Sequence, residues 1–304
     1  MVGGRYLRGR VARSTGAFGL KIRLWQLAAG LMALTPCATA TAAAAQQDEP
    51  SPHRQQDCAT PALWVVRDAD TTVYLFGTFH ALDGKSHWFD HAVKRAFDGA
   101  DTLVLETLVP DTPEKIDAAL ARHRARKLAA ASPALPAAQP SAGLAGARQA
   151  MAAARSAGLS VEQGADAVLH RAADAAGKPV HGLEPFEAQL AMYDRLPQAA
   201  PPRTVRRSAA SPASVAAAMK QMLESWNRGD HRTFEGVVGS VHAQSPEAFR
   251  ILFTERNTAW AEWVTARMEK PGSVFVAVGM GHLVGPENVL TLLAQKGFTS
   301  TRVR

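Results

Sequence analysis

The sequence predicts an α/β fold: a mixed, partly parallel central sheet with flanking helices and helical insertions. Short apolar runs alternate with helix-like segments along the chain, and this alternation is typical of the α/β class. Only a tight turn separates the first two runs, so they must be antiparallel, whereas later strands are joined by helices and can be parallel. With 304 residues, of which 47% are hydrophobic, the chain is large enough to bury such a core.

The first half of the predicted sheet comes from three apolar runs. Residues 63–67 and 71–76 read as a hairpin with a turn at 68–70. A helix is predicted from about Trp88 to Phe97, because apolar residues recur there with helical spacing, and a buried strand follows at 102–105. These elements supply three strands and one covering helix.

The middle of the chain differs in composition. Residues from about 121 to 160 are dominated by Ala, and Pro133, Pro136 and Pro140 interrupt any long helix. Such a composition indicates a partly helical insertion. A second loose stretch, rich in Pro, Ala and Arg, is expected at about 197–212.

Helix and strand patterns resume after the Ala-rich insertion and continue to the C-terminus. The predicted elements are a helix at 161–176, a strand at 178–183, helices at 187–196, 213–227 and 246–269, a strand at 274–278, a helix at 286–296 and a last short strand ending at Arg304.

The N-terminus has the layout of a secretory signal peptide. Residues 1–45 contain six basic and no acidic residues, followed by an apolar stretch at 24–34 and small residues at 38–45. The stretch is shorter than the roughly 20 residues of a membrane-spanning helix. We expect cleavage after Ala45, a flexible segment at 46–60, and a periplasmic or secreted domain at 61–304 with no stable membrane span.

Charge provides no support for nucleic-acid binding. The formal net charge is +7, but the six basic residues of the leader account for most of it, and the remaining chain is close to neutral. No helix-turn-helix or RNA-binding signature is present. A nucleic-acid partner is therefore not expected.

Four strand ends carry residues capable of chemistry. The sequence Gly77-Thr78-Phe79-His80 follows one strand, Glu106 and Glu184 follow two others, and Gly279-Met280-Gly281-His282 follows a fourth. In open α/β sheets, ligands bind at the carboxyl ends of the strands. Two imidazoles and two carboxylates are thus expected to meet at one edge of the sheet.

Such a set suits a divalent metal ion such as Mn, Co or Zn. Two His and one Glu would leave positions open for water and substrate, and metal-bound water loses its proton near neutral pH. A lone His after a strand can instead be a hydrogen-bonded structural group, and a lone Glu a helix cap. Four other histidines are possible substitutes as ligands: His87, His91, His170 and His181.

Arg256 and Asn257 lie on the predicted C-terminal helix at 246–269. An Arg fork directed at the strand ends would bind a substrate carboxylate or stabilise an oxyanion. The alternative is a surface ion pair with Glu255 or Glu262, and spacing alone favours that alternative.

At these residues the chain resembles the TraB/GumN family, to which the Tiki proteins are distantly related. The shared features are the two Gly-x-x-His motifs, the strand-end Glu106 and Glu184, and the Arg256-Asn257 pair. Tiki-like members are metal-dependent peptidases that act through two such histidines and a glutamate, so the resemblance implies His80, His282 and Glu106 as metal ligands.

The resulting hypothesis is an exported metal-dependent hydrolase, specifically a peptidase, acting on a peptide or small-molecule substrate. Glu184 would complete the metal shell or act as general base, and Arg256, supported by Asn257, would polarise or anchor the substrate. The alternative is a non-catalytic periplasmic protein that binds a peptide or small ligand. A third hypothesis is a scaffold whose Ala-rich insertion docks on envelope partners.

Overall fold

The computed structural model of the chain describes residues 59–130, 142–197 and 212–303. The expected signal peptide at 1–45 and nearly all of the expected segment at 46–60 lie outside these residues. So does almost the whole of the loose stretch expected at 197–212.

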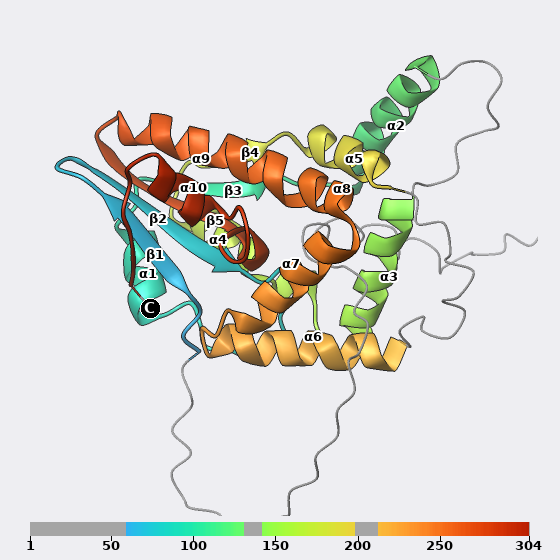
Figure 1. Cartoon of the computed structure of the whole chain (residues 1–304), viewed down its shortest axis with the longest axis horizontal. Coiled ribbons are helices and arrows are strands. Elements are labelled where there is room, and N and C mark those ends of the chain that lie inside the picture. The colour runs from blue at the N-terminus through green and yellow to red at the C-terminus, as the bar shows by residue number, and fades with distance from the viewer. Residues whose placement is uncertain (1–58, 131–141, 198–211, 304) are drawn as a thin grey trace, which may run out of the picture.

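A six-stranded mixed sheet forms the centre of the molecule (Figure 1). Its strand order is β4-β3-β5-β2-β1-β6. Strands β2, β5, β3 and β4 are mutually parallel, while β1 is antiparallel to both β2 and β6. The strands are β1 (Leu63–Arg67), β2 (Thr71–Thr78), β3 (Thr102–Thr107), β4 (Val180–Glu184), β5 (Gly272–Gly279) and β6 (Ser300–Arg302).

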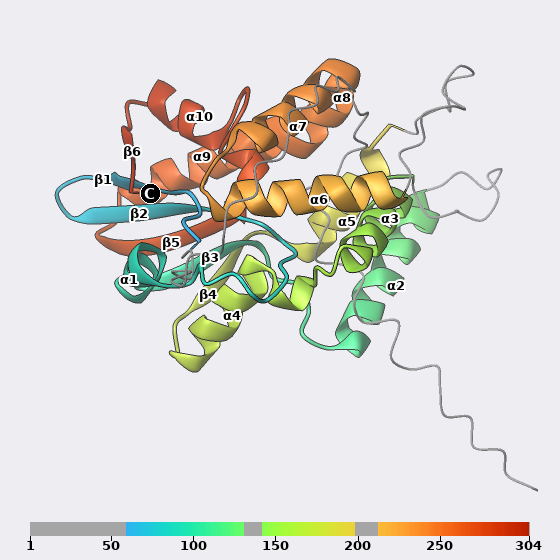
Figure 2. The same cartoon turned by 90° about the horizontal axis from the view of Figure 1, so that it is seen from below.

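Helices cover both faces of the sheet and its carboxyl edge. Figure 2 shows α9 and α10 on one face and α1 and α4 on the other. In both views α2, α3 and α5 gather at the end to which β2 and its parallel neighbours run. The helices are α1 (His91–Asp98), α2 (Pro113–Ala130), α3 (Ala142–Ser156), α4 (Ala165–Ala175), α5 (Phe186–Arg195), α6 (Pro212–Asn227), α7 (Arg232–Gln244), α8 (Pro246–Phe249), α9 (Glu255–Met268) and α10 (Val289–Gln295).

The architecture confirms the predicted fold class, and most expected elements are present. Helix α7 is absent from the prediction, and so is the first part of α2, which begins before the predicted insertion. The predicted helix at 246–269 is divided into α8, a π-helical segment at Arg250–Thr254, and α9. The Ala-rich region is helical at both ends, through α2 and α3, and residues 131–141 between them lie outside the described part.

An aromatic cluster anchors the end of β2. Phe76 stacks on Trp88 with ring centroids 5.5 Å apart, and Trp226 of α6 contacts both rings edge-on. The Trp226 indole Nε1 donates a 2.8 Å hydrogen bond to the Gly77 carbonyl. A buried indole needs such a partner, and this one fixes the chain where the first Gly-x-x-His motif begins.

Within the described ranges, no helix has both the length and the apolar character needed to cross a membrane.

Candidate functional site

The two Gly-x-x-His motifs leave neighbouring parallel strands and pack against each other. Thr78 at the end of β2 pairs in register with Gly279 at the end of β5. A Cβ on Gly77 would collide with the Met280 Sδ, and one on Gly279 would lie 2.9 Å from the His80 Nε2. Each motif's first glycine therefore makes room for a side chain of the other motif.

His80 is held by an aspartate from helix α4. Its Nδ1 lies 2.7 Å from the Asp166 Oδ2. This nitrogen therefore carries a proton and donates a hydrogen bond to the carboxylate. The other ring nitrogen, Nε2, is buried and has no hydrogen-bond partner among the described residues. A buried polar atom without a partner destabilises the folded state. The His80 Nε2 lies beside Gly279, at the junction of the two motifs.

His282 is completely buried and is held by α9. The Asn257 Nδ2 donates to the Glu287 carbonyl at 2.8 Å, so the Asn257 Oδ1 faces the His282 Nδ1 at 2.7 Å. The imidazole therefore carries its proton on Nδ1, and its Nε2 accepts from the Arg256 NH1 at 2.9 Å. Two aromatic rings, of Trp260 and Phe253, pack against the imidazole.

Glu106 and Glu184 meet at the same guanidinium. The Arg256 NH2 donates to the Glu106 Oε2 at 3.0 Å, and its Nε donates to the Glu184 Oε1 at 2.8 Å. The second Glu106 oxygen accepts from the Gly279 N–H at 2.6 Å and lies 3.7 Å from the His282 Nε2. The fold thus brings together all six predicted site residues: His80, Glu106, Glu184, Arg256, Asn257 and His282.

Arg256 does not form the surface ion pair that spacing alone favours. Its side chain is only 6% exposed, and its partners come from β3, β4 and the turn after β5. Its neighbour Glu255 instead pairs with Arg195 and Arg250 at the surface. That interpretation was wrong because helical spacing shows which residues share a face of α9 but not what packs against it.

The two histidines have opposite proton affinities. Burial lowers the pKa of His80, but the charges of Asp166 and Glu106 and the hydrogen bond to Asp166 outweigh burial and raise it to about 9. Burial lowers the pKa of His282 well below its usual value, and the neighbouring Arg256 and His80 lower it further. Burial also lowers the pKa of Arg256, but Glu106 and Glu184 raise it overall, so this guanidinium stays charged.

The cluster fits a metal ion in the nature of its donors. Both motif histidines have Nδ1 fixed by a side-chain oxygen, the arrangement that orients metal-binding imidazoles. His80 also presents a buried nitrogen without a partner. In the present arrangement, however, no three His, Cys, Asp or Glu side chains of the described residues are placed to hold a metal together. Arg256 instead occupies the His282 Nε2 and one Glu106 oxygen.

Three residues of the cluster were missed by sequence reasoning. Asp166 holds His80 from 86 positions away, and no short motif connects the two. Glu287 holds Asn257 through its carbonyl, in a left-handed conformation with φ of 52° that is rare outside glycine. The Tyr193 hydroxyl is buried without a partner in the described structure, and its pKa is raised by burial and by Glu106 and Glu184, despite the opposing effect of Arg256.

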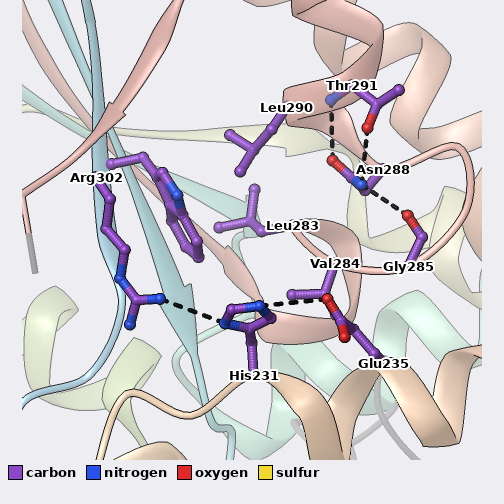
Figure 3. Close-up of a pocket in the computed structure, with 10 residues that line it drawn as sticks. His231, Glu235, Leu283, Val284, Gly285, Asn288, Leu290, Thr291 and Arg302 are labelled. Atoms are coloured by element: carbon purple, nitrogen blue, oxygen red, sulfur yellow. Dashed lines mark hydrogen bonds and ion pairs between the residues drawn. The ribbon is translucent and has the colours of Figure 1, made fainter.

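A separate hollow of about 410 Å³ lies between α7, the loop before α10 and the β1–β6 edge (Figure 3). In this hollow, His231 lies between Arg302 and Glu235, at 3.3 and 3.4 Å respectively. None of the six site residues lines it. Two of its lining residues, Leu283 and Val284, directly follow His282 in the chain.

Comparisons with known proteins agree on one family. The sequence model of the TraB/PrgY/gumN family matches residues 62–130 and 108–302. The chain is 27% identical over 248 residues to a protein of Escherichia coli (strain K12) described as uncharacterized protein YbaP, an alignment that covers 77% of this chain and 92% of that protein. No solved structure matches the chain.

Proposed function

We propose that this chain, which belongs to the TraB/PrgY/gumN family, is a metal-dependent hydrolase, specifically a peptidase, that acts outside the cytoplasm. One observation carries the proposal. The two Gly-x-x-His histidines come from distant parts of the chain and turn their Nε2 atoms into one buried cluster that also contains Glu106. Convergence of titratable groups at a strand-end site is typical of catalytic centres.

The proposed metal ligands are His80, His282 and Glu106. Imidazole nitrogen and carboxylate oxygen are ligands for Zn, Co and Mn, which leaves the identity of the ion to experiment. When bound, such an ion would polarise a carbonyl and would lower the pKa of water, so that hydroxide is available as the nucleophile. The reaction class proposed is therefore hydrolysis of an amide bond.

The chain's own residues would orient the reacting groups and control protons. Asp166 and Asn257 hold the two imidazole rings at Nδ1, which leaves Nε2 of each ring as the atom directed at the cluster. Glu184, with 16% of its side chain exposed, is the more accessible of the two glutamates. We assign it the role of general base, which accepts a proton from the attacking water.

Arg256 has a different role from a free substrate clamp. Its guanidinium is engaged by Glu106, Glu184 and His282, so it is not presented as an open fork for a substrate carboxylate. It balances the charges of two partly or fully buried glutamates, which would otherwise be costly to desolvate.

The test combines metal binding with product analysis. Protein stripped by a chelator and reloaded with Mn²⁺, Co²⁺ or Zn²⁺ should cleave components of a defined peptide mixture, with fragments identified by mass spectrometry. His80→Ala and His282→Ala should abolish both cleavage and metal binding by calorimetry. His170→Ala is the matched control, because His170 pairs with Asp174 at the surface of α4, the helix that carries Asp166.

Two results would contradict the proposal. Equal metal binding by the wild type and by both motif variants would remove the ligand assignment. Peptides recovered intact from the loaded protein, but retained by it, would favour the non-catalytic binding alternative.

Export is the remaining part of the proposal. It is supported by the basic, apolar and small-residue segments at 1–45. Expression of the full chain followed by cell fractionation and N-terminal sequencing should give a periplasmic product that begins after Ala45. A cytoplasmic product that retains Met1 would contradict it.

A further inference from the structure

Arg256 lies where the proposed metal ligands converge. Its NH1 donates to the His282 Nε2 at 2.9 Å, and its NH2 donates to the Glu106 Oε2 at 3.0 Å. The guanidinium also lies over the Trp260 ring, 4.5 Å from the centroid. Thus one buried cation already uses an atom of two of the three proposed ligands.

The His282 Nε2 can serve only one partner. Because its Nδ1 carries the proton that faces Asn257, Nε2 has a single lone pair. That lone pair accepts from Arg256 in the present structure. An ion bound at this nitrogen and the Arg256 hydrogen bond therefore exclude each other.

Charge leads to the same conclusion. A divalent ion placed beside a buried guanidinium would repel it, and repulsion between like charges is strong where water is excluded. Glu184 is a partner that the guanidinium can keep when an ion binds. It accepts from the Arg256 Nε at 2.8 Å and is not a proposed metal ligand. Arg256 could thus give up His282 and Glu106 and remain paired.

We propose that Arg256 is the resident cation of the metal-free site, and that its guanidinium must leave His282 and Glu106 for a metal ion to bind. This inference rests on the proposed function, since it assumes the same three ligands. It adds that Arg256 weakens the affinity of the site for the metal ion, and so raises the metal concentration needed to fill the site. Arg256 balances the negative charge of the glutamates when no metal ion is bound, and it competes with the metal ion for His282 and Glu106.

The test measures cobalt affinity of chelator-treated protein by calorimetry and by the visible absorption of bound Co²⁺, two readouts independent of turnover. Arg256→Gln removes the charge, and Arg256→Lys keeps the charge but cannot reach several partners as a fork. We expect affinity to increase about tenfold or more in Arg256→Gln and by less in Arg256→Lys, on the scale of other changes around metal ligands. Arg250→Gln is the matched control, because Arg250 pairs with Glu247 and Glu255 on the exposed surface.

The outcomes separate this inference from the proposed function. Folded Arg256 variants that bind Co²⁺ no more tightly than the wild type would overturn the inference, while the metal site itself would survive if His80→Ala still abolished binding. Absence of cobalt binding in every protein would overturn both. If the variants do not fold, a structure of the cobalt-loaded wild type decides: an intact hydrogen bond between Arg256 and His282 would overturn the inference, and its loss to a bound ion would support it.

Discussion

The two Gly-x-x-His motifs share one backbone plan and differ in electrostatics. Each motif ends a parallel strand, and each contributes a histidine whose Nδ1 is bound by a side-chain oxygen. For His80 that oxygen belongs to a carboxylate, and the pKa is raised to about 9. For His282 it belongs to the neutral amide of Asn257, and burial, together with the adjacent Arg256, lowers the pKa.

The comparison separates what a motif specifies from what its surroundings specify. The glycine and the strand end determine where the imidazole lies and let the two motifs approach closely. The surroundings of each imidazole determine its charge: burial and Arg256 keep His282 neutral, whereas for His80 the charges of Asp166 and Glu106 outweigh burial. Without a metal ion, His80 is therefore an imidazolium at neutral pH and His282 is a neutral imidazole.

The largest loss of stability is expected on substitution of Glu106, which lies next to both histidines. Glu106→Ala would leave the buried Arg256 without one of its two carboxylates and the Gly279 N–H without its acceptor. Removing one partner of a buried ion pair costs about 3–5 kcal/mol, which urea unfolding would measure. Glu262→Ala, on the exposed face of α9, should change stability by no more than about 0.5 kcal/mol; similar values for both variants would contradict the shared role.

The two histidines should give stability opposite pH dependence in protein stripped of metal ions. The folded pKa of His80 lies above its unfolded value, so its contribution is complete below pH 6.5 and is lost as pH rises through about 9. That contribution is about 3 kcal/mol. The lowered pKa of His282 acts in the opposite direction, since stability is lost as pH falls below the unfolded value.

Asp166→Asn isolates the His80 contribution. Urea unfolding of the wild type and of this variant between pH 6 and pH 10 should show a stability difference that is largest at pH 6 and shrinks toward pH 10. A difference that stays constant over this range would show that Asp166 does not raise the pKa of His80.

Exchanging the partner of His282 would sharpen the comparison further. Asn257→Asp should raise the pKa of His282, because it supplies the carboxylate that His80 already has. It also removes the donor to the Glu287 carbonyl, at a cost of about 1–3 kcal/mol for an unsatisfied buried group. Nuclear magnetic resonance of labelled histidines would follow both rings, and an unchanged His282 signal between pH 5 and 8 would contradict the account.

The smallest effects are expected at the two motif glycines. A Cβ at position 279 would press on the His80 ring and the Glu106 Oε1, which are both held in place, so Gly279→Ala should cost about 1–3 kcal/mol. A Cβ at position 77 would meet the end of the Met280 side chain, which can move aside, so Gly77→Ala should cost about 1 kcal/mol or less. Thermal unfolding of the two variants measures these costs. Equal losses of stability would contradict the difference expected between the two glycines.

Much of the fold follows from local sequence patterns. The prediction fails where a local pattern is weak and packing decides the structure. Helix α7 contains Gly236 and Gly239, which weaken a helical signal. Burial of Phe234, Val238 and Val241 against the core stabilises it nonetheless. Tertiary packing of this kind is invisible to a reading of propensities along the chain.

The site was predictable to the extent that parallel strands bring their carboxyl ends together. That rule alone places His80, Glu106, Glu184 and His282 at one edge of the sheet. Asp166 was not predictable, because it lies on a helix and reaches His80 only after α4 packs beside the strand end.

The amino-acid sequence by itself determined the α/β class, the family and the set of imidazoles and carboxylates at the strand ends, because strand periodicity and motif spacing are properties of neighbouring residues. Only the tertiary structure decided which ring nitrogen faces the cluster, which histidine is charged, and that Arg256 is buried among the glutamates. Those properties depend on distances between groups from separate elements, since burial and the field of nearby charges act through space and not along the chain.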